Sequence, residues 1–249
     1  MYIHDNERID AVNDSLSLIQ KTDGLTFGTD ALLLAGYVNG KYKAGAELGG
    51  GSGIISMLLL TRDKLDKCTA YEIQQEYSEL ISRNAEYNSL SERLTAVCAD
   101  VRELSTTESF DVVFTNPPYM KSTSGKSNLS DKKAIARHEI HGDISDFTES
   151  ARRILKFGGA FYAVYRPDRL TDIISAMRQS GIEPKRMTFV HADTDVEASM
   201  VLIEGKSGGK SGMQLTKPLI IYKDKLHKEY RDEMEYIMEN GSFPPEYKR

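Results

Sequence analysis

The chain has few cysteines, and they support neither a covalent framework nor a metal site. Only Cys68 and Cys98 occur among 249 residues, too few for a disulfide scaffold. Both lie at the ends of expected strands, where a small apolar side chain packs well. His138 and His141 are separated by two residues, which is not the spacing of a zinc-protease motif. We therefore expect no disulfide and no metal.

Long apolar runs and an apolar leader are also lacking. The longest near-continuous apolar run, Ile54 to Leu60, is far shorter than a membrane span. The amino terminus has no basic segment followed by an apolar one, as a secretory signal requires. With 40% apolar and 28% charged residues, the composition is that of a globular protein, which we expect in the cytoplasm. The net charge of −5 argues against coating of nucleic acid by the whole surface, although a local basic patch remains compatible with it.

From residue 45 onward, strand-like and helix-like segments alternate, which predicts an α/β fold with a mostly parallel, doubly wound sheet. Residues 1–40 are expected to form an N-terminal extension with a short hairpin and a helix, followed by one domain over residues 41–249. Expected strands cover 46–48, 68–73, 94–98, 111–115, 160–164, 187–191, 199–204 and 218–222. Expected helices cover 52–60, 74–88, 143–157, 168–180 and 225–239, the third ended by Gly158 and Gly159.

A glycine-rich turn joins the first of these strands to the helix after it. The segment Glu47 to Gly53 reads ELGGGSG, which allows a sharp bend and close approach to a ligand. A dinucleotide-binding turn would need glycine at position 54, which is Ile54. Glycines at Gly49, Gly51 and Gly53 after an acidic residue suit S-adenosylmethionine better, because that ligand has no pyrophosphate. A tight turn that binds nothing is the alternative.

The next two strand ends carry acidic residues. Glu72 and Ile73 end one strand, and the Glu72 carboxylate is placed to accept hydrogen bonds from ribose hydroxyls. Asp100 and Val101 end the other, where Asp100 is placed to accept an adenine amino group and Val101 to offer a backbone amide. A helix-terminal acid and a turn aspartate are the ordinary alternatives. Three such elements on successive strand ends nevertheless predict one cofactor cleft.

The most informative segment, Asn116-Pro117-Pro118-Tyr119, directly follows the expected strand at 111–115. It places an amide, a rigid elbow and an aromatic face at the carboxyl edge of the sheet, where ligands bind in open α/β folds. These groups suit a planar group with an exocyclic amino nitrogen, such as adenine. Stacking of Tyr119 on such a base would contribute roughly 1–3 kcal/mol. An ordinary turn after a strand is the alternative.

Together these motifs resemble the class I S-adenosylmethionine-dependent methyltransferases, in the branch that methylates amino groups conjugated to a π system. The resemblance implies a Rossmann-like, seven-stranded, mostly parallel sheet with helices on both faces. It also implies S-adenosylmethionine as cofactor, with Asn116 among its contacts. The side-chain carbonyl of Asn116 and the main-chain carbonyl of Pro117 would accept the two N–H bonds of the target amine. No strong general base is needed, because the methyl donor is an activated sulfonium.

Segments outside this core narrow the resemblance. Residues 27–34, 136–139 and 165–170 resemble the tRNA adenine-N6 methyltransferases that modify the adenosine beside the anticodon of a valine tRNA. Glu47 replaces the usual aspartate of that family, and position 50 is glycine rather than cysteine or threonine. Asp30 would approach the methionine end of the cofactor, with helix capping as the alternative. The same chemistry on ribosomal RNA or a protein glutamine, and a non-catalytic RNA-binding protein, are the alternatives to a tRNA enzyme.

A polar loop after residue 120 is the expected RNA contact. Between residues 121 and 137, five basic side chains stand against one acid, Asp131. Such a cationic loop can contact phosphates and become ordered on binding, although a solvated surface loop has the same composition. The candidate RNA-contacting residues are Lys121, Lys126, Lys132, Lys133, Arg137 and His138.

Overall fold

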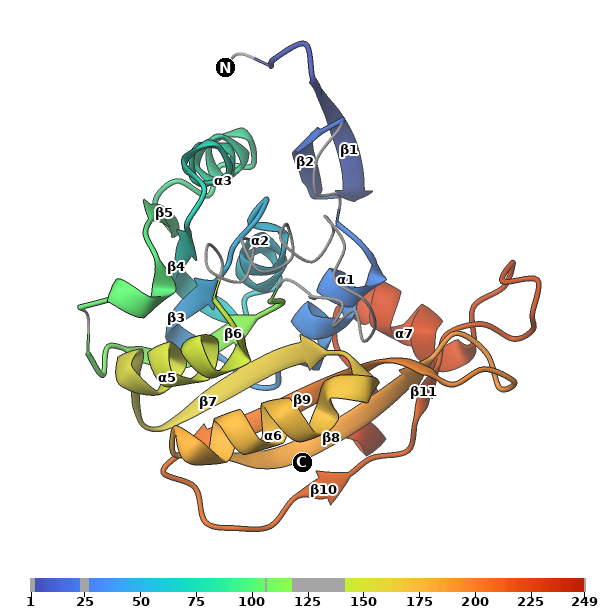
Figure 1. Ribbon diagram of the computed structural model, residues 1–249. Coiled ribbons are helices and arrows are strands. Elements are labelled where there is room, and N and C mark those ends of the chain that lie inside the picture. Colours follow the sequence, from blue (N-terminus) through green and yellow to red (C-terminus); the bar gives the residue numbers. More distant parts are fainter. Residues whose placement is uncertain (1–2, 23–26, 106, 118–141, 249) are drawn as a thin grey trace, which may run out of the picture.

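The computed structural model describes residues 3–22, 27–105, 107–117 and 142–248, which form a central sheet with helices on both faces (Figure 1). The sheet has nine strands in the order β10-β8-β9-β7-β6-β3-β4-β5, with β11 also paired to β8. The long strands are β3 (Tyr42–Leu48), β4 (Leu65–Glu72), β5 (Leu94–Cys98), β6 (Phe110–Thr115), β7 (Leu155–Tyr165), β8 (Ile182–His191) and β9 (Ala198–Ser207). The short ones are β10 (Gln214–Leu215) and β11 (Leu219–Ile220).

The directions of the strands confirm the expected mostly parallel α/β sheet. Strand β9 runs antiparallel to β7 and β8, whereas the other pairings of this sheet are parallel. The resemblance implied seven strands, whereas the sheet has nine in the described residues, because the two-residue strands β10 and β11 lie at the β8 edge. Of these two, β11 falls within the strand expected at 218–222, and β10 was not expected. Because β3 lies between β4 and β6, the carboxyl ends of these three strands meet at one place.

The helices pack on the sheet through two apolar cores. Alternate residues of a strand face opposite sides, so Val112 and Phe114 enter one core and Val113 enters the other. The first core includes α1 (Thr29–Tyr37), α2 (Ile54–Thr61), α3 (Gln75–Tyr87) and α7 (Asp232–Asn240). The second includes α5 (Ile144–Ile154) and α6 (Leu170–Gln179), which lie together on the opposite face (Figure 1).

Two expected helix boundaries are wrong. Helix α5 ends at Ile154 rather than 157, because Leu155 turns to extended backbone and pairs with Phe110 of β6. Gly158 and Gly159 therefore lie within β7 and do not end the helix. The last helix begins at residue 232 rather than 225.

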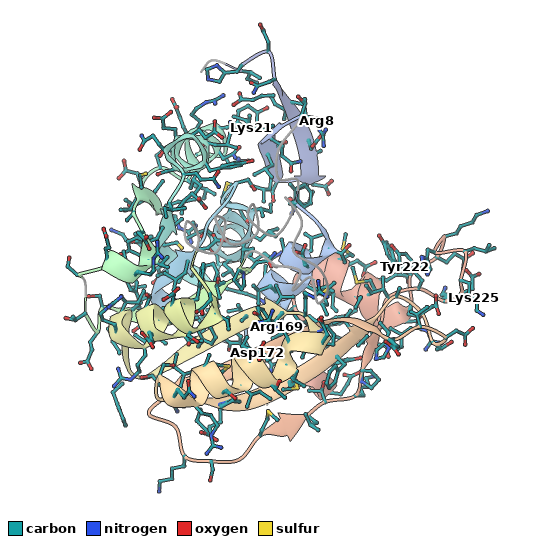
Figure 2. The ribbon with its side chains drawn as sticks, in the orientation of Figure 1. Arg8, Lys21, Arg169, Asp172, Tyr222 and Lys225 are labelled. Carbon is teal, nitrogen blue, oxygen red and sulfur yellow. The ribbon has the colours of Figure 1, made fainter. Side chains whose placement is uncertain are left out.

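The segment before α7 is instead a loop held by aromatic stacking. Tyr222 and Tyr230 form a β-bridge, and their rings stack with centroids 5.2 Å apart. Tyr222 and Lys225 mark this loop, which extends away from the sheet in Figure 2. Because these contacts join positions before and after residue 225, the chain reverses where the sequence predicted a helix.

A separate hairpin of β1 (Glu7–Asn13) and β2 (Leu16–Lys21) packs on α3. Asn84 of α3 accepts a hydrogen bond from the Ile19 nitrogen at 2.7 Å and donates to the Ile19 carbonyl at 3.1 Å. It also donates to the Ser52 carbonyl at 3.1 Å, which links the hairpin to the glycine-rich turn. Lys21, labelled at the end of the hairpin in Figure 2, forms an ion pair of 2.6 Å with Glu76.

Candidate active site

The glycine-rich turn adopts a conformation that favours glycine. Gly49, Gly51 and Gly53 have φ angles of +73°, +54° and +80°, in the left-handed region. A Cβ atom on Gly53 would lie 3.0 Å from the Ile81 side chain of α3, so a larger residue there would crowd this packing. A Cβ atom on Gly51 would meet nothing within 4 Å. The turn therefore exposes backbone to open space at Gly51, as a ligand-binding turn requires.

Glu72, at the end of β4, ties that strand to the turn. Its side chain is buried, and its two oxygens accept hydrogen bonds from the Gly51 nitrogen at 2.9 Å and the Gln74 nitrogen at 3.0 Å. The Gln74 side chain also donates to Glu72 Oε1, at 3.5 Å. A carboxylate has about four acceptor sites, so these three bonds leave capacity for a ligand hydroxyl. Ile73 follows directly, and its carbonyl accepts a bond from the Cys98 thiol at 3.6 Å.

Glu47, near the end of β3, faces helix α2. It is 1% exposed, and one carboxylate oxygen accepts bonds from the Ser56 nitrogen, at 3.1 Å, and from the Ser56 hydroxyl. Burial raises the pKa of Glu47 to about 8. In these contacts the carboxyl fixes α2 against β3. Ser56 was missed by the sequence reasoning, although it is the polar residue within the apolar run from Ile54 to Leu60.

Asp100 and Val101 lie at the third strand end, as expected, and make contacts that the sequence reasoning missed. The Asp100 carboxylate accepts from Arg102 Nε at 2.9 and 3.0 Å, and this hydrogen-bonded arginine lowers the pKa of Asp100. The Val101 side chain is buried, and its carbonyl accepts from the Ser150 hydroxyl of α5 at 2.6 Å. A ligand amino group at Asp100 would therefore share the carboxylate with the guanidinium of Arg102.

Asn116 is held at the end of β6 between two other elements. The buried Thr115 hydroxyl before it donates to the Leu48 carbonyl at 2.8 Å, which fixes the end of β6 to the end of β3. The amide nitrogen of Asn116 donates to Asp30 Oδ2 at 2.7 Å. Asp30 lies in the first turn of α1, so α1 and the ends of β3 and β6 come together at this corner.

Two cavities adjoin this corner and share Tyr165 as a wall. One has a volume of about 780 Å³, and its lining includes Asp30, Tyr165 and Arg166. The other, of about 300 Å³, has a lining that includes Pro117, Tyr165 and Arg169. Arg169 is paired with Asp172 at the start of α6 (Figure 2). The corner therefore has open space on two sides, large enough for parts of an acceptor.

Several expected site residues lie outside the described ranges, so their contacts stay predictions: Pro118, Tyr119, Lys121, Lys126, Lys132, Lys133, Arg137 and His138. Within the described ranges, no group of three or more His, Cys, Asp or Glu side chains is arranged to hold a metal ion. No helix in those ranges is long and apolar enough to span a bilayer.

Known proteins match both the sequence and the fold. A relative from Phocaeicola vulgatus named tRNA1(Val) (adenine(37)-N6)-methyltransferase is 26% identical over 180 residues, covering 72% of this chain and 76% of the relative. A protein of the same name from Vibrio cholerae is 25% identical over 189 residues, covering 76% and 78%.

A solved structure from Agrobacterium tumefaciens, titled a predicted O-methyltransferase, superposes with a TM-score of 0.70 at 23% identity. The match covers 86% of this chain and 98% of that one, and at this identity it shows the shared fold. The family model for the methyltransferase small domain matches residues 21–179. That range includes Asp30, the glycine-rich turn, Glu72, Asp100 and Asn116. The chain therefore belongs to the methyltransferase small domain family.

Proposed function

We propose that this methyltransferase transfers a methyl group from S-adenosylmethionine to the exocyclic N6 of an adenosine in tRNA. The observation that carries the proposal is the position of Asn116 at the same sheet edge as Gly51 and Glu72, on adjacent strand ends. A side-chain amide there lies beside a turn and a carboxylate suited to a nucleoside. The edge thus combines groups for a cofactor with groups for an amine acceptor.

The residues present fit S-adenosylmethionine. The open space at Gly51 leaves room for a ligand against the turn, and the partly used carboxylate of Glu72 suits ribose hydroxyls. Asp100, Ile73 and Val101 are the proposed contacts for the adenine end. When bound, S-adenosylmethionine supplies a methyl group activated on a positively charged sulfonium. Glu47 is proposed to act indirectly, because its carboxyl contacts Ser56.

The corner supplies the chemistry at the acceptor. An adenine N6 is a poor nucleophile, because its lone pair is delocalised into the ring. In the proposed mechanism, Asn116 Oδ1 and the Pro117 carbonyl accept the two N–H bonds and stabilise the positive charge that develops on nitrogen. Proline fixes the backbone direction at this corner, so the two acceptors are already oriented. Orientation of this kind can account for much of a rate enhancement.

The choice of tRNA as acceptor is supported by the names of the two curated relatives, which specify adenine 37 of a valine tRNA. It is also supported by the excess of basic residues between positions 121 and 137. We extend the proposal to that loop as the phosphate contact. Two carbonyl acceptors would also serve a glutamine amide, so the acceptor must be tested directly.

The test is methylation of tRNA isolated from a strain that lacks this gene, with nucleosides measured by mass spectrometry. We expect N6-methyladenosine in one tRNA and none in ribosomal RNA, and no methylated glutamine in the peptides of a release factor offered as substrate. Asn116→Ala should lose most turnover and still bind S-adenosylmethionine in calorimetry. Near-normal turnover of this variant would contradict the acceptor mechanism, and absence of methylation in every tRNA would contradict the substrate.

A further inference from the structure

We propose that Asp30 is a positioning residue that fixes the orientation of the Asn116 amide, with the NH2 group toward Asp30 and the carbonyl oxygen toward the substrate amine. The proposal rests on the function proposed above and concerns a contact between residues 86 positions apart. It starts from the bond of 2.7 Å between Asn116 Nδ2 and Asp30 Oδ2. Asp30 is thus assigned a second role beside the expected one at the cofactor.

The chemistry of the pair decides the orientation. An ionised carboxylate only accepts hydrogen bonds, whereas an amide has one donating and one accepting end of nearly equal shape. Beside Asp30, Asn116 must therefore present its NH2 group, which leaves Oδ1 at the other end of the amide. In the reversed orientation the carbonyl oxygen would face the carboxylate, and the NH2 group would face the amino group of the substrate. Both contacts would be unfavourable.

The charge of Asp30 also makes Asn116 Oδ1 a stronger hydrogen-bond acceptor. A hydrogen bond to an ionised group is roughly twice as strong as a neutral one, and it polarises the amide that donates it. Electron density on Asn116 Oδ1 rises as a result. The same oxygen would accept the N–H bond of an amine that becomes positively charged. Asp30 would therefore act through Asn116, without contacting the reacting nitrogen.

The local structure holds Asp30 in this position. Gly28 immediately before α1 has no side chain, and a Cβ atom there would lie 2.7 Å from Asp30 Oδ1. The Phe27 nitrogen donates to Gln20 Oε1 at 2.8 Å, and Gln20 of β2 is 2% exposed. The start of α1 is thus anchored to the hairpin. Gly28 is exposed, so packing does not explain why this position is glycine.

The experiment compares Asp30→Asn with Asn116→Ala and with the double variant. Asparagine at position 30 can pair with either orientation of the amide and carries no charge. At saturating S-adenosylmethionine, we expect kcat for tRNA methylation to fall at least fivefold, with KM for tRNA changed less than twofold. In the Asn116→Ala background, Asp30→Asn should change kcat less than twofold. An effect of equal size in both backgrounds would overturn the proposal.

A second readout does not depend on activity. In 15N-labelled protein, the Asn116 side-chain proton bonded to the carboxylate should be shifted downfield, and Asp30→Asn should remove this shift. Gly28→Ala should move the same resonance and lower kcat, because the added Cβ would displace the Asp30 carboxylate. Unlike Asp30→Asn, this variant keeps the carboxylate itself. An unmoved resonance in both variants would refute the contact, even if the protein methylates no tRNA. Asp232→Asn, which removes an exposed acid from the first turn of α7, is the matched control and should change neither readout.

Discussion

Replacement of Glu47 by glutamine should remove a strong pH dependence from the stability of the fold. The carboxyl is 1% exposed and accepts its hydrogen bonds from Ser56 on the adjacent helix. Burial raises its pKa from 4.5 to about 8, since a charged carboxylate there would lose its hydration. Glutamine has nearly the same shape and keeps an acceptor for the Ser56 nitrogen. It carries no charge at any pH.

The sign and size follow from proton binding. Between pH 4.5 and about 8, the folded carboxyl holds a proton that the unfolded one has lost, so the unfolding free energy falls as pH rises. The stabilising contribution is complete below pH 4.5 and is lost by about pH 8. Each pH unit in this window changes the free energy by about 1.4 kcal/mol, so the whole window amounts to about 5 kcal/mol.

The assay is urea unfolding of the wild-type protein and Glu47→Gln at pH 5, 6, 7 and 8. We expect similar stability at pH 5 and a growing advantage of the variant above it, reaching several kcal/mol at pH 8. Glu92→Gln, at an exposed position, is the control and should follow the wild type. If the wild-type and Glu47→Gln curves stay parallel, Glu47 is ionised in the folded protein and the reasoning is wrong.

Two further predictions concern ligand contacts. Gly51→Ala should cost about 1–2 kcal/mol of stability, from the left-handed backbone alone, and should weaken S-adenosylmethionine binding; Gly53→Ala should destabilise more, because its Cβ would also lie 3.0 Å from Ile81. Calorimetry measures S-adenosylmethionine binding, and urea unfolding measures stability. Equal losses of stability in Gly51→Ala and Gly53→Ala would contradict the role given to the contact with Ile81. Neutralising Lys132 and Lys133 together should weaken tRNA binding and reduce its salt dependence. The control neutralises Lys206 and Lys210, which line a cavity with Asp111 at the start of β6, and should change neither. An unchanged salt slope would remove the loop from the interface.

Most of the sheet was predictable, because each of its long strands carries its own signal. Short apolar segments separated by helical periodicity predicted the α/β layers, and the glycines of the turn needed only local backbone geometry. The end of α5 was not predictable in this way. Ile154 and Leu155 are both buried, and both fit the helical period, but Leu155 is buried by its pairing with Phe110. That pairing depends on the position of another strand.

The same difference between local signals and contacts with distant elements applies to the candidate site. The sequence identified Glu72, Asp100 and Asn116 because each lies at or just after the end of a strand, and parallel strands end at one edge. It did not reveal that the Glu47 carboxyl accepts hydrogen bonds from Ser56, or that Arg102 donates hydrogen bonds to the Asp100 carboxylate. The Arg102 contact spans two residues and was visible in principle. The Glu47 contact needed the packing of α2 on β3, so spacing alone could not supply it.

The contact between Asp30 and Asn116 shows what motifs alone leave undetermined. The types of residue at the corner indicate an acceptor for an amine, but an asparagine side chain offers a donor as readily as an acceptor. A partner that cannot donate, such as the Asp30 carboxylate, fixes the position of the NH2 end and therefore which end faces the substrate. The sequence places that partner 86 residues away, in the helix before the sheet. If the pair acts as proposed, the amino-terminal hairpin and α1 belong functionally to the catalytic domain, because they orient the amide on which its chemistry depends.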